Sequence, residues 1–140
     1  MKKLKITLCF IALLIVILSC MAFTSTYYTT LNIKVAVQGP TRYYNGQNLQ
    51  YSATTSVDWH HKTNHYYTVA LYRKNFIGAS YIGSKNLLRD GHGIINWSNI
   101  GPGNYYTYTS KANDDVRLTS DNVIIRNYYK ERENNFVNQY

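Results

Sequence analysis

The residues that most invite chemistry are three histidines, His60, His61 and His65, which fall within six residues of the chain. They lie in the stretch VDWHHKTNHYY, and Asp58 stands just before them. Neutral imidazole nitrogens together with a carboxylate suit Zn²⁺ or Cu²⁺. His61 and His65 also have the i, i+4 spacing that serves zinc on a helix. Whether that spacing can bring the two imidazoles onto one metal ion depends on the secondary structure that carries them.

The sequence on both sides places these histidines on a connection between two strands. Apolar and polar residues alternate in NLQYSATTSV before them and in HYYTVALYRK after them, and a period of two predicts strands. A loop does not impose helical geometry, and the fourth histidine, His92, belongs to another predicted turn. We therefore predict a solvated polar loop and no metal site, with His60, His61 and His65 as weak metal candidates.

The same alternation runs through the rest of the chain. Further segments are LNIKVAV, FIGASYIG, GIINWSNI, NYYTYTSK and SDNVIIRNYY, separated by turn sequences such as YNGQ, DGHG and GPGN. After the N-terminal segment, for which a signal-peptide helix is expected, no stretch shows a helical period over eleven residues. About seven short strands in about a hundred residues predict an all-β fold, a single antiparallel β-sandwich over residues 25–129.

The stretch NIGPGNYYTYT is the most specific local pattern. Ile100 and a Gly-Pro-Gly turn precede Tyr105, which opens an alternating segment. This resembles the tyrosine corner of immunoglobulin-like and fibronectin-type-III-like sandwiches. The resemblance implies that the Tyr105 hydroxyl bonds back to the preceding corner, and it implies a fold without an activity. The Cys–Trp–Cys pattern of antibody domains is absent.

Tyrosine is unusually frequent, with fifteen residues, ten of them in adjacent pairs. Adjacent residues of a strand point to opposite faces, so each pair sends one ring inward and one outward. Outward tyrosines suit sugars or peptides, since the ring is apolar and its tip is polar. The alternative is that tyrosine is simply a good strand former. The candidate ligand-binding residues are Tyr66, Tyr72, Tyr106 and Tyr108.

Catalytic chemistry has little support in the sequence. The only two glutamates lie in the C-terminal segment, and both cysteines lie near the N-terminus. Oxygen-rich side chains near the last predicted hairpin could hold Ca²⁺, although turn chemistry explains them equally well: Asn113, Asp114, Asp115 and Asp121. We predict neither an enzyme nor a cofactor.

The N-terminus has the layout of an export segment. Three lysines precede a nearly unbroken apolar run over residues 6–18, which predicts a signal peptide or signal anchor over residues 1–24. A spanning helix needs about 20 apolar residues. The sequence ILSC, which ends at Cys20, resembles the lipobox of bacterial lipoproteins, with Leu18 as its departure. Cleavage near Ala22 or Thr24, lipidation of Cys20 and a retained anchor are the three alternatives.

These alternatives place the protein in two different locations. We predict cleavage, which gives a secreted protein. The alternative, lipidation or a retained anchor, attaches the protein to the outer face of the cytoplasmic membrane. Both cysteines lie in residues 1–24, so the exported domain has no disulfide, which is typical of a bacterial, and more specifically a Gram-positive, product. Residues 130–140 form a polar tail.

The net charge and its distribution limit the classes of partner that the protein can bind. Loss of the three N-terminal lysines lowers the formal charge from +8 to about +5. The cations are dispersed, whereas nucleic-acid binding favours a clustered basic stripe. A cell-wall polymer, a glycan, a protein surface or an anionic membrane remain as partners. We predict a secreted or surface-tethered binding module. The alternative is a secreted bacteriocin-like or toxin-like effector that acts at a cell envelope.

Overall fold

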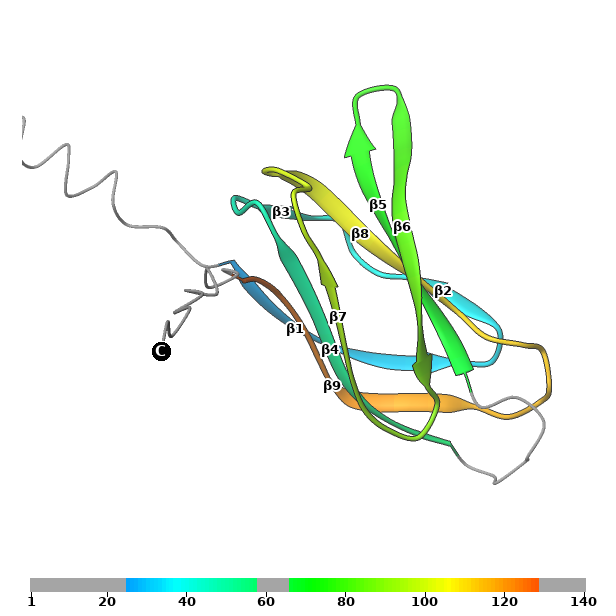
Figure 1. Cartoon of the computed structure of the whole chain (residues 1–140). Coiled ribbons are helices and arrows are strands. Elements are labelled where there is room, and N and C mark those ends of the chain that lie inside the picture. Colours follow the sequence, from blue (N-terminus) through cyan, green and yellow to red (C-terminus); the bar gives the residue numbers. More distant parts are fainter. Residues whose placement is uncertain (1–24, 58–65, 129–140) are drawn as a thin grey trace, which may run out of the picture.

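The computed structural model describes residues 25–57 and 66–128, and these form nine strands in two antiparallel sheets with no helix (Figure 1). The all-β prediction is therefore confirmed, and the two sheets are consistent with a β-sandwich. Residues 1–24, which hold the predicted export segment and Cys20, lie outside the described residues, as do residues 58–65 and 129–140.

The first sheet has four strands. In spatial order they are β1 (Thr26–Ile33), β9 (Leu118–Asn127), β4 (Leu49–Val57) and β7 (Gly91–Trp97).

The second sheet has five strands, and β8 and β5 are its two inner strands. Its spatial order is β2 (Ala36–Gln38), β8 (Gly103–Ser110), β5 (Tyr66–Asn75) and β6 (Gly78–Leu88), and β3 (Arg42–Tyr44) pairs with β8 beyond the end of β2.

One predicted strand is divided between the sheets. Alternation over LNIKVAV predicted a single face, but the chain bends at Lys34 and Val35 and passes from β1 in one sheet to β2 in the other. Leu31 and Ile33 are buried, whereas Val35 and Val37 are exposed. Periodicity could not predict the bend, because the same alternation fits two short strands or one long strand.

The last strand departs from the immunoglobulin arrangement. In that arrangement the final strand lies in the same sheet as the two strands equivalent to β5 and β8. Here β9 lies between β1 and β4 in the opposite sheet, and β2 and β3 occupy the position beside β8. The resemblance therefore holds for the antiparallel two-sheet architecture and not for the position of the last strand.

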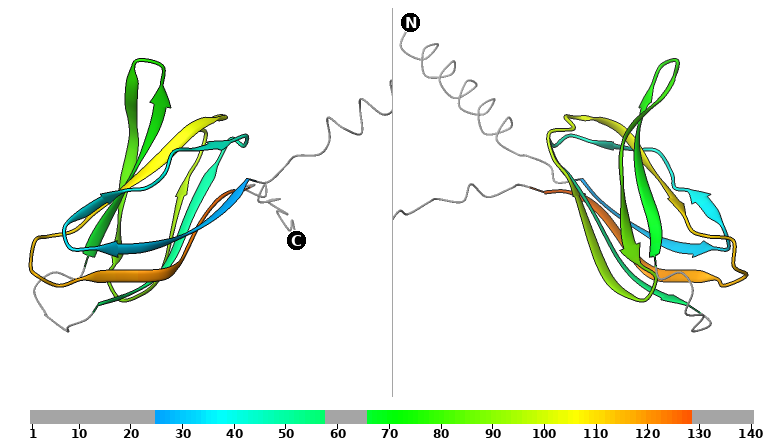
Figure 2. Two further views of the ribbon diagram at one scale, coloured as in Figure 1. Left: turned by 180° about the vertical axis from the view of Figure 1, so that it is seen from behind. Right: turned by 45° about the vertical axis from the view of Figure 1, so that its right-hand side comes forward.

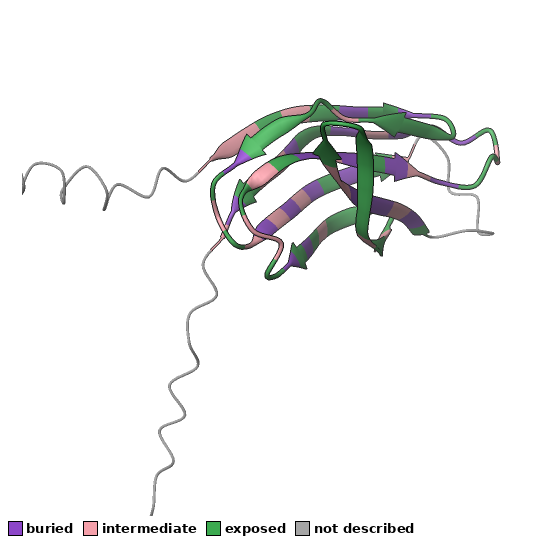
Figure 3. Ribbon diagram, turned by 90° about the horizontal axis from the view of Figure 1, so that it is seen from above, coloured by how far each residue is buried: buried purple, intermediate pink, exposed green. Residues whose placement is uncertain are grey.

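The core lies between the sheets and follows the alternation of the strands. Along β5, Tyr67, Val69 and Leu71 are buried and face the first sheet. Buried and exposed residues alternate along several strands (Figure 3). The largest fully buried side chains are three tyrosines, Tyr51, Tyr67 and Tyr105, each of which removes a large apolar ring surface from water.

Three tyrosine pairs of the described ranges divide between core and surface as predicted. Tyr44 is buried and Tyr43 exposed, and Tyr67 is buried and Tyr66 exposed. The pair at 105 and 106 has its first ring buried and its second half-buried. Because neighbouring side chains of a strand point to opposite faces of the sheet, burial of one ring directs the next ring toward solvent.

Candidate functional site

A row of three tyrosines crosses the outer face of the five-stranded sheet. The register pairs Tyr72 of β5 with Tyr106 of β8 on one side and with Tyr81 of β6 on the other. The Tyr72 and Tyr106 rings stack with centroids 5.2 Å apart and planes 8° apart. The Tyr72 and Tyr81 rings meet edge to face at 5.5 Å. We call Tyr106, Tyr72 and Tyr81 the tyrosine row.

Tyr108 extends the aromatic surface along β8. It lies two residues beyond Tyr106 and pairs with Ala70, so it shares the outer face of the sheet. The exposed fraction of Tyr108 is 39%, whereas Ala70, its small partner on β5, is buried. The predicted residues Tyr72, Tyr106 and Tyr108 therefore lie together.

Tyr66, the fourth predicted residue, lies apart from the other three. It occupies the same face of β5, six residues before Tyr72, which corresponds to about 20 Å along a strand. It is exposed, at 54%. The structure thus brings three of the four predicted tyrosines to one end of this face.

Sequence reasoning missed Tyr81. The register between β5 and β6 shifts between Leu71 and Tyr72, where Leu71 pairs with Gly83 and Tyr72 with Tyr81. The extra residue, Ile82, interrupts the alternation of β6. A bulge of this kind re-aims the following side chains. The only sequence feature that points to Tyr81 is its place in the strand that follows the tyrosine-rich β5.

Hydroxyl and amide groups lie along the same face of the sheet as the tyrosine row. The Tyr81 hydroxyl donates a hydrogen bond to Ser84 Oγ over 2.9 Å. The Thr68 hydroxyl donates one to Asn86 Oδ1 over 2.8 Å. Gln38 of β2 pairs with Tyr108. Stacked rings bordered by neutral donors and acceptors can bind a polar ligand with an apolar face.

Asp114, a predicted calcium candidate, lies between two cations at the opposite end of the sandwich. It forms ion pairs with Arg89 and, over 2.7 Å, with Lys111 Nζ. Partial burial acts to raise the pKa of Asp114, but hydrogen bonds and charge from Lys111 and Arg89 lower it to about 2. This network ties the turn after β6 to the connection before β9.

The other predicted metal candidates do not assemble with it. Asp115 and Asp121 are both exposed, and the described ranges contain no group of three His, Cys, Asp or Glu residues placed to hold a metal ion. His60, His61 and His65 lie outside the described residues, so the predicted polar loop stays a prediction.

Tyr105 lies at the start of β8, where the chain turns from one sheet to the other. Its hydroxyl donates toward the carbonyl oxygens of Ile100 and Gly101, at 2.6 and 2.9 Å. A bond to the backbone a few residues upstream is the contact that defines a tyrosine corner. The Arg73 guanidinium lies 5.8 Å from the centre of the Tyr105 ring and donates to the Pro102 carbonyl oxygen over 2.9 Å.

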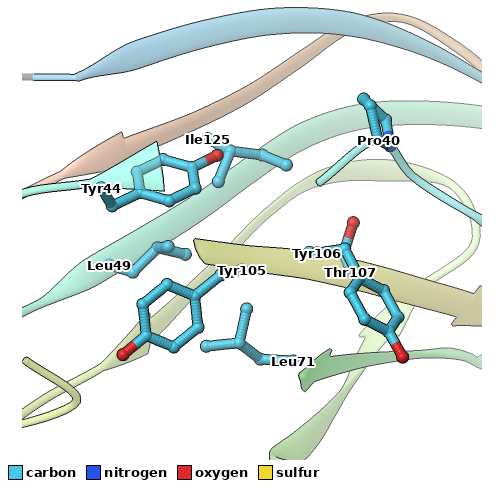
Figure 4. A pocket seen from close by; sticks show the side chains of 8 residues that line it. All are labelled: Pro40, Tyr44, Leu49, Leu71, Tyr105, Tyr106, Thr107 and Ile125. Carbon is cyan, nitrogen blue, oxygen red and sulfur yellow. The ribbon is translucent and has the colours of Figure 1, made fainter. Parts of the chain in front are cut away.

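Among the described residues, side chains of the two sheets line cavities between them. One, of about 10 Å³, is lined by side chains such as Leu49 and Ile125 of the first sheet and Leu71 of the second (Figure 4), and it holds no more than a water molecule. Another, of about 210 Å³, opens beside β1 and β2 and is lined in part by Tyr51 and Thr109. It is smaller than most ligand pockets.

None of the described residues forms a helix that is long and apolar enough to span a membrane. Comparison of the chain with models of known protein families gives no match, and comparison with curated protein sequences gives none either. Any functional conclusion therefore rests on the site itself.

Proposed function

We propose that this protein is an extracellular bacterial binding module that holds a glycan, such as a wall polysaccharide, on the tyrosine row. The observation that carries the proposal is the stack of Tyr72 on Tyr106, with Tyr81 against the same ring. Tyrosine is enriched at binding surfaces because it is apolar on its face and polar at its tip. A sugar ring has a matching apolar face and a hydroxyl rim.

A glycan fits this surface better than an extended peptide. Peptides that add to a sheet require an unpaired strand edge. Tyr72 and Tyr106 instead belong to the two inner strands, β5 and β8, and project from a fully paired face. The neutral hydroxyl and amide groups of Thr68, Ser84 and Asn86 lie along that face and suit hydroxyl-rich ligands.

The export address is part of the proposal. The predicted N-terminal export segment supports a domain that works outside the cytoplasm. The absence of cysteine after Cys20 supports a bacterial source. Secretion and attachment through Cys20 or a retained anchor both deliver the tyrosine row to the envelope.

Sedimentation with purified Gram-positive cell wall, before and after removal of teichoic acid, tests the proposal. The Tyr72→Ala/Tyr106→Ala double variant should bind at least about tenfold more weakly, which corresponds to about 1.4 kcal/mol. Tyr28→Ala is the matched control, because Tyr28 is 74% exposed and lies on β1 of the other sheet. Equal loss in both variants, or no loss in either, would contradict the assignment.

The effector alternative predicts a different result. A bacteriocin-like protein would inhibit growth of related bacteria in a plate assay, whereas a binding module would leave growth unchanged. Inhibition that persists in the Tyr72→Ala/Tyr106→Ala variant would overturn the proposed function.

A further inference from the structure

The hairpin of β5 and β6 carries two fully exposed apolar residues at its tip. Phe76 and Ile77 form the turn, and their exposed fractions are 104% and 95%. Pairing of β5 with β8 ends at Arg73, whereas pairing with β6 continues to Asn75 and Gly78. The hairpin therefore extends beyond the rest of the sheet, as both views of Figure 2 show.

Side-chain contacts cross the neck of the hairpin. Asn75 Nδ2 donates a hydrogen bond to Ser80 Oγ over 2.6 Å. The rings of Tyr72 and Tyr81 pack against each other below this bond. These cross-strand contacts hold the two apolar side chains at a fixed place away from the core.

Turn chemistry does not explain an apolar tip. Two-residue hairpin turns favour Gly, Asn and Asp, because these residues adopt the required backbone angles readily. Phe76 and Ile77 have negative φ angles, and their exposure means that they add nothing to the core. Paired, exposed apolar side chains of this kind favour contact with another apolar phase.

Charge is distributed unequally between the two ends of the sandwich. The end that bears the hairpin tip carries four cations near the ends of their strands: Arg42, Arg73, Lys74 and Arg126. The described carboxylates all belong to the opposite half: Asp90, Asp114, Asp115 and Asp121. The tip therefore stands at a cationic end without a described acidic residue, which complements an anionic surface.

The N-terminal segment joins the domain at this same end. The Ser25 carbonyl oxygen accepts a hydrogen bond from the Asn127 amide over 3.1 Å, and Thr26 pairs with Arg126 at the end of β9. Ser25 is five positions after Cys20, a reach of at most about 18 Å. Any tether through residues 1–24 would therefore turn the hairpin end toward its attachment surface.

The geometry points to a membrane contact: Phe76 and Ile77 enter the headgroup boundary of an anionic lipid bilayer while Lys74 and the neighbouring cations bind its phosphates. Apolar side chains beside cations are the usual means by which a surface segment binds anionic lipid. The inference rests on the proposed export address. It does not rest on glycan binding, since the tip residues are not part of the tyrosine row.

Tryptophan placed at the tip reports the contact directly. The full chain with Phe76→Trp is reconstituted with vesicles of phosphatidylcholine and phosphatidylglycerol, some of them brominated on the acyl chains. Asn113→Trp, in the connection before β9 at the other end, is the matched control. The wild-type chain supplies the background from Trp59 and Trp97. We expect bromine to quench the tip tryptophan at least twofold more than the control.

Separate experiments test the preference for anionic lipid. Quenching at the tip should fall in pure phosphatidylcholine vesicles, at high salt and in a Lys74→Gln background, because screening or removal of charge weakens the contact. Equal quenching at both positions, or none at the tip, would overturn the inference. No quenching at the tip is also the result expected if the tip binds a protein instead of lipid. Tip quenching that is unchanged in neutral vesicles would overturn the anionic preference.

Discussion

The hydroxyl of the buried Tyr105 lies 2.6 Å from the carbonyl oxygen of Ile100, a residue of the connection between β7 and β8. This contact ties the corner to the start of β8. The Tyr105→Phe variant should lower the free energy of unfolding by about 1 kcal/mol or more, the scale for loss of a buried hydrogen bond. Chemical denaturation measures the change. An unchanged free energy would remove the structural role of the hydroxyl.

Tyr51→Phe should behave differently. The Tyr51 hydroxyl is buried and makes no hydrogen bond of acceptable geometry with the described residues, although Tyr67 and Thr109 lie beside it. Removal of an unsatisfied buried hydroxyl leaves the free energy of unfolding unchanged or raises it by up to about 1 kcal/mol. The same denaturation experiment checks it, and a loss as large as that of Tyr105→Phe would contradict the reasoning.

Asp114→Asn should destabilise the domain by about 3 kcal/mol. The substitution removes the negative charge that pairs with the fully buried Lys111 ammonium and replaces the oxygen that faces Arg89 by an amide donor. A buried charge without its counter-charge is costly. Asp115→Asn is the control, since Asp115 is the exposed neighbour and surface substitutions change stability by about 0.5 kcal/mol or less. Thermal denaturation at neutral pH measures the loss of stability in both variants.

Acid should weaken the same ion-pair network. The pKa of Asp114 is lowered from 3.8 to about 2 in the folded protein. A lowered pKa gives stability that is present above pH 4 and is lost as the pH falls through about 2. The carboxylate is partly in contact with solvent, so we expect a loss of about 1 to 2 kcal/mol. A stability profile of Asp114→Asn that falls as steeply as the wild type would contradict this assignment.

Alkaline pH should also unfold the domain. Burial raises the pKa of Tyr44, Tyr51, Tyr67 and Tyr105 above 10.0. The unfolded chain loses these protons near pH 10 while the folded chain keeps them, so stability falls as the pH rises above about 10. Tyrosinate absorbance and circular dichroism should therefore change together for the buried group. Ionisation of every tyrosine with the sheet signal intact would refute this prediction.

The sequence by itself determined which side chains of a strand share a face. Alternation correctly assigned Tyr67, Val69 and Leu71 to one face of β5 and Tyr66 and Tyr72 to the other. The corner at Tyr105 was also readable, because its partner lies only five residues away. Such features are local: the direction of a side chain depends on the strand's period of two and on the turn beside it.

Only the tertiary structure decided which strands meet. The stack of Tyr72 on Tyr106 depends on the register of β5 with β8, and the contact with Tyr81 depends on a bulge that shifts β6 by one residue. The insertion of β9 between β1 and β4 is likewise a non-local pairing. Periodicity carries no information on these choices, because many pairings bury the same apolar faces and the packing of the whole sandwich selects one.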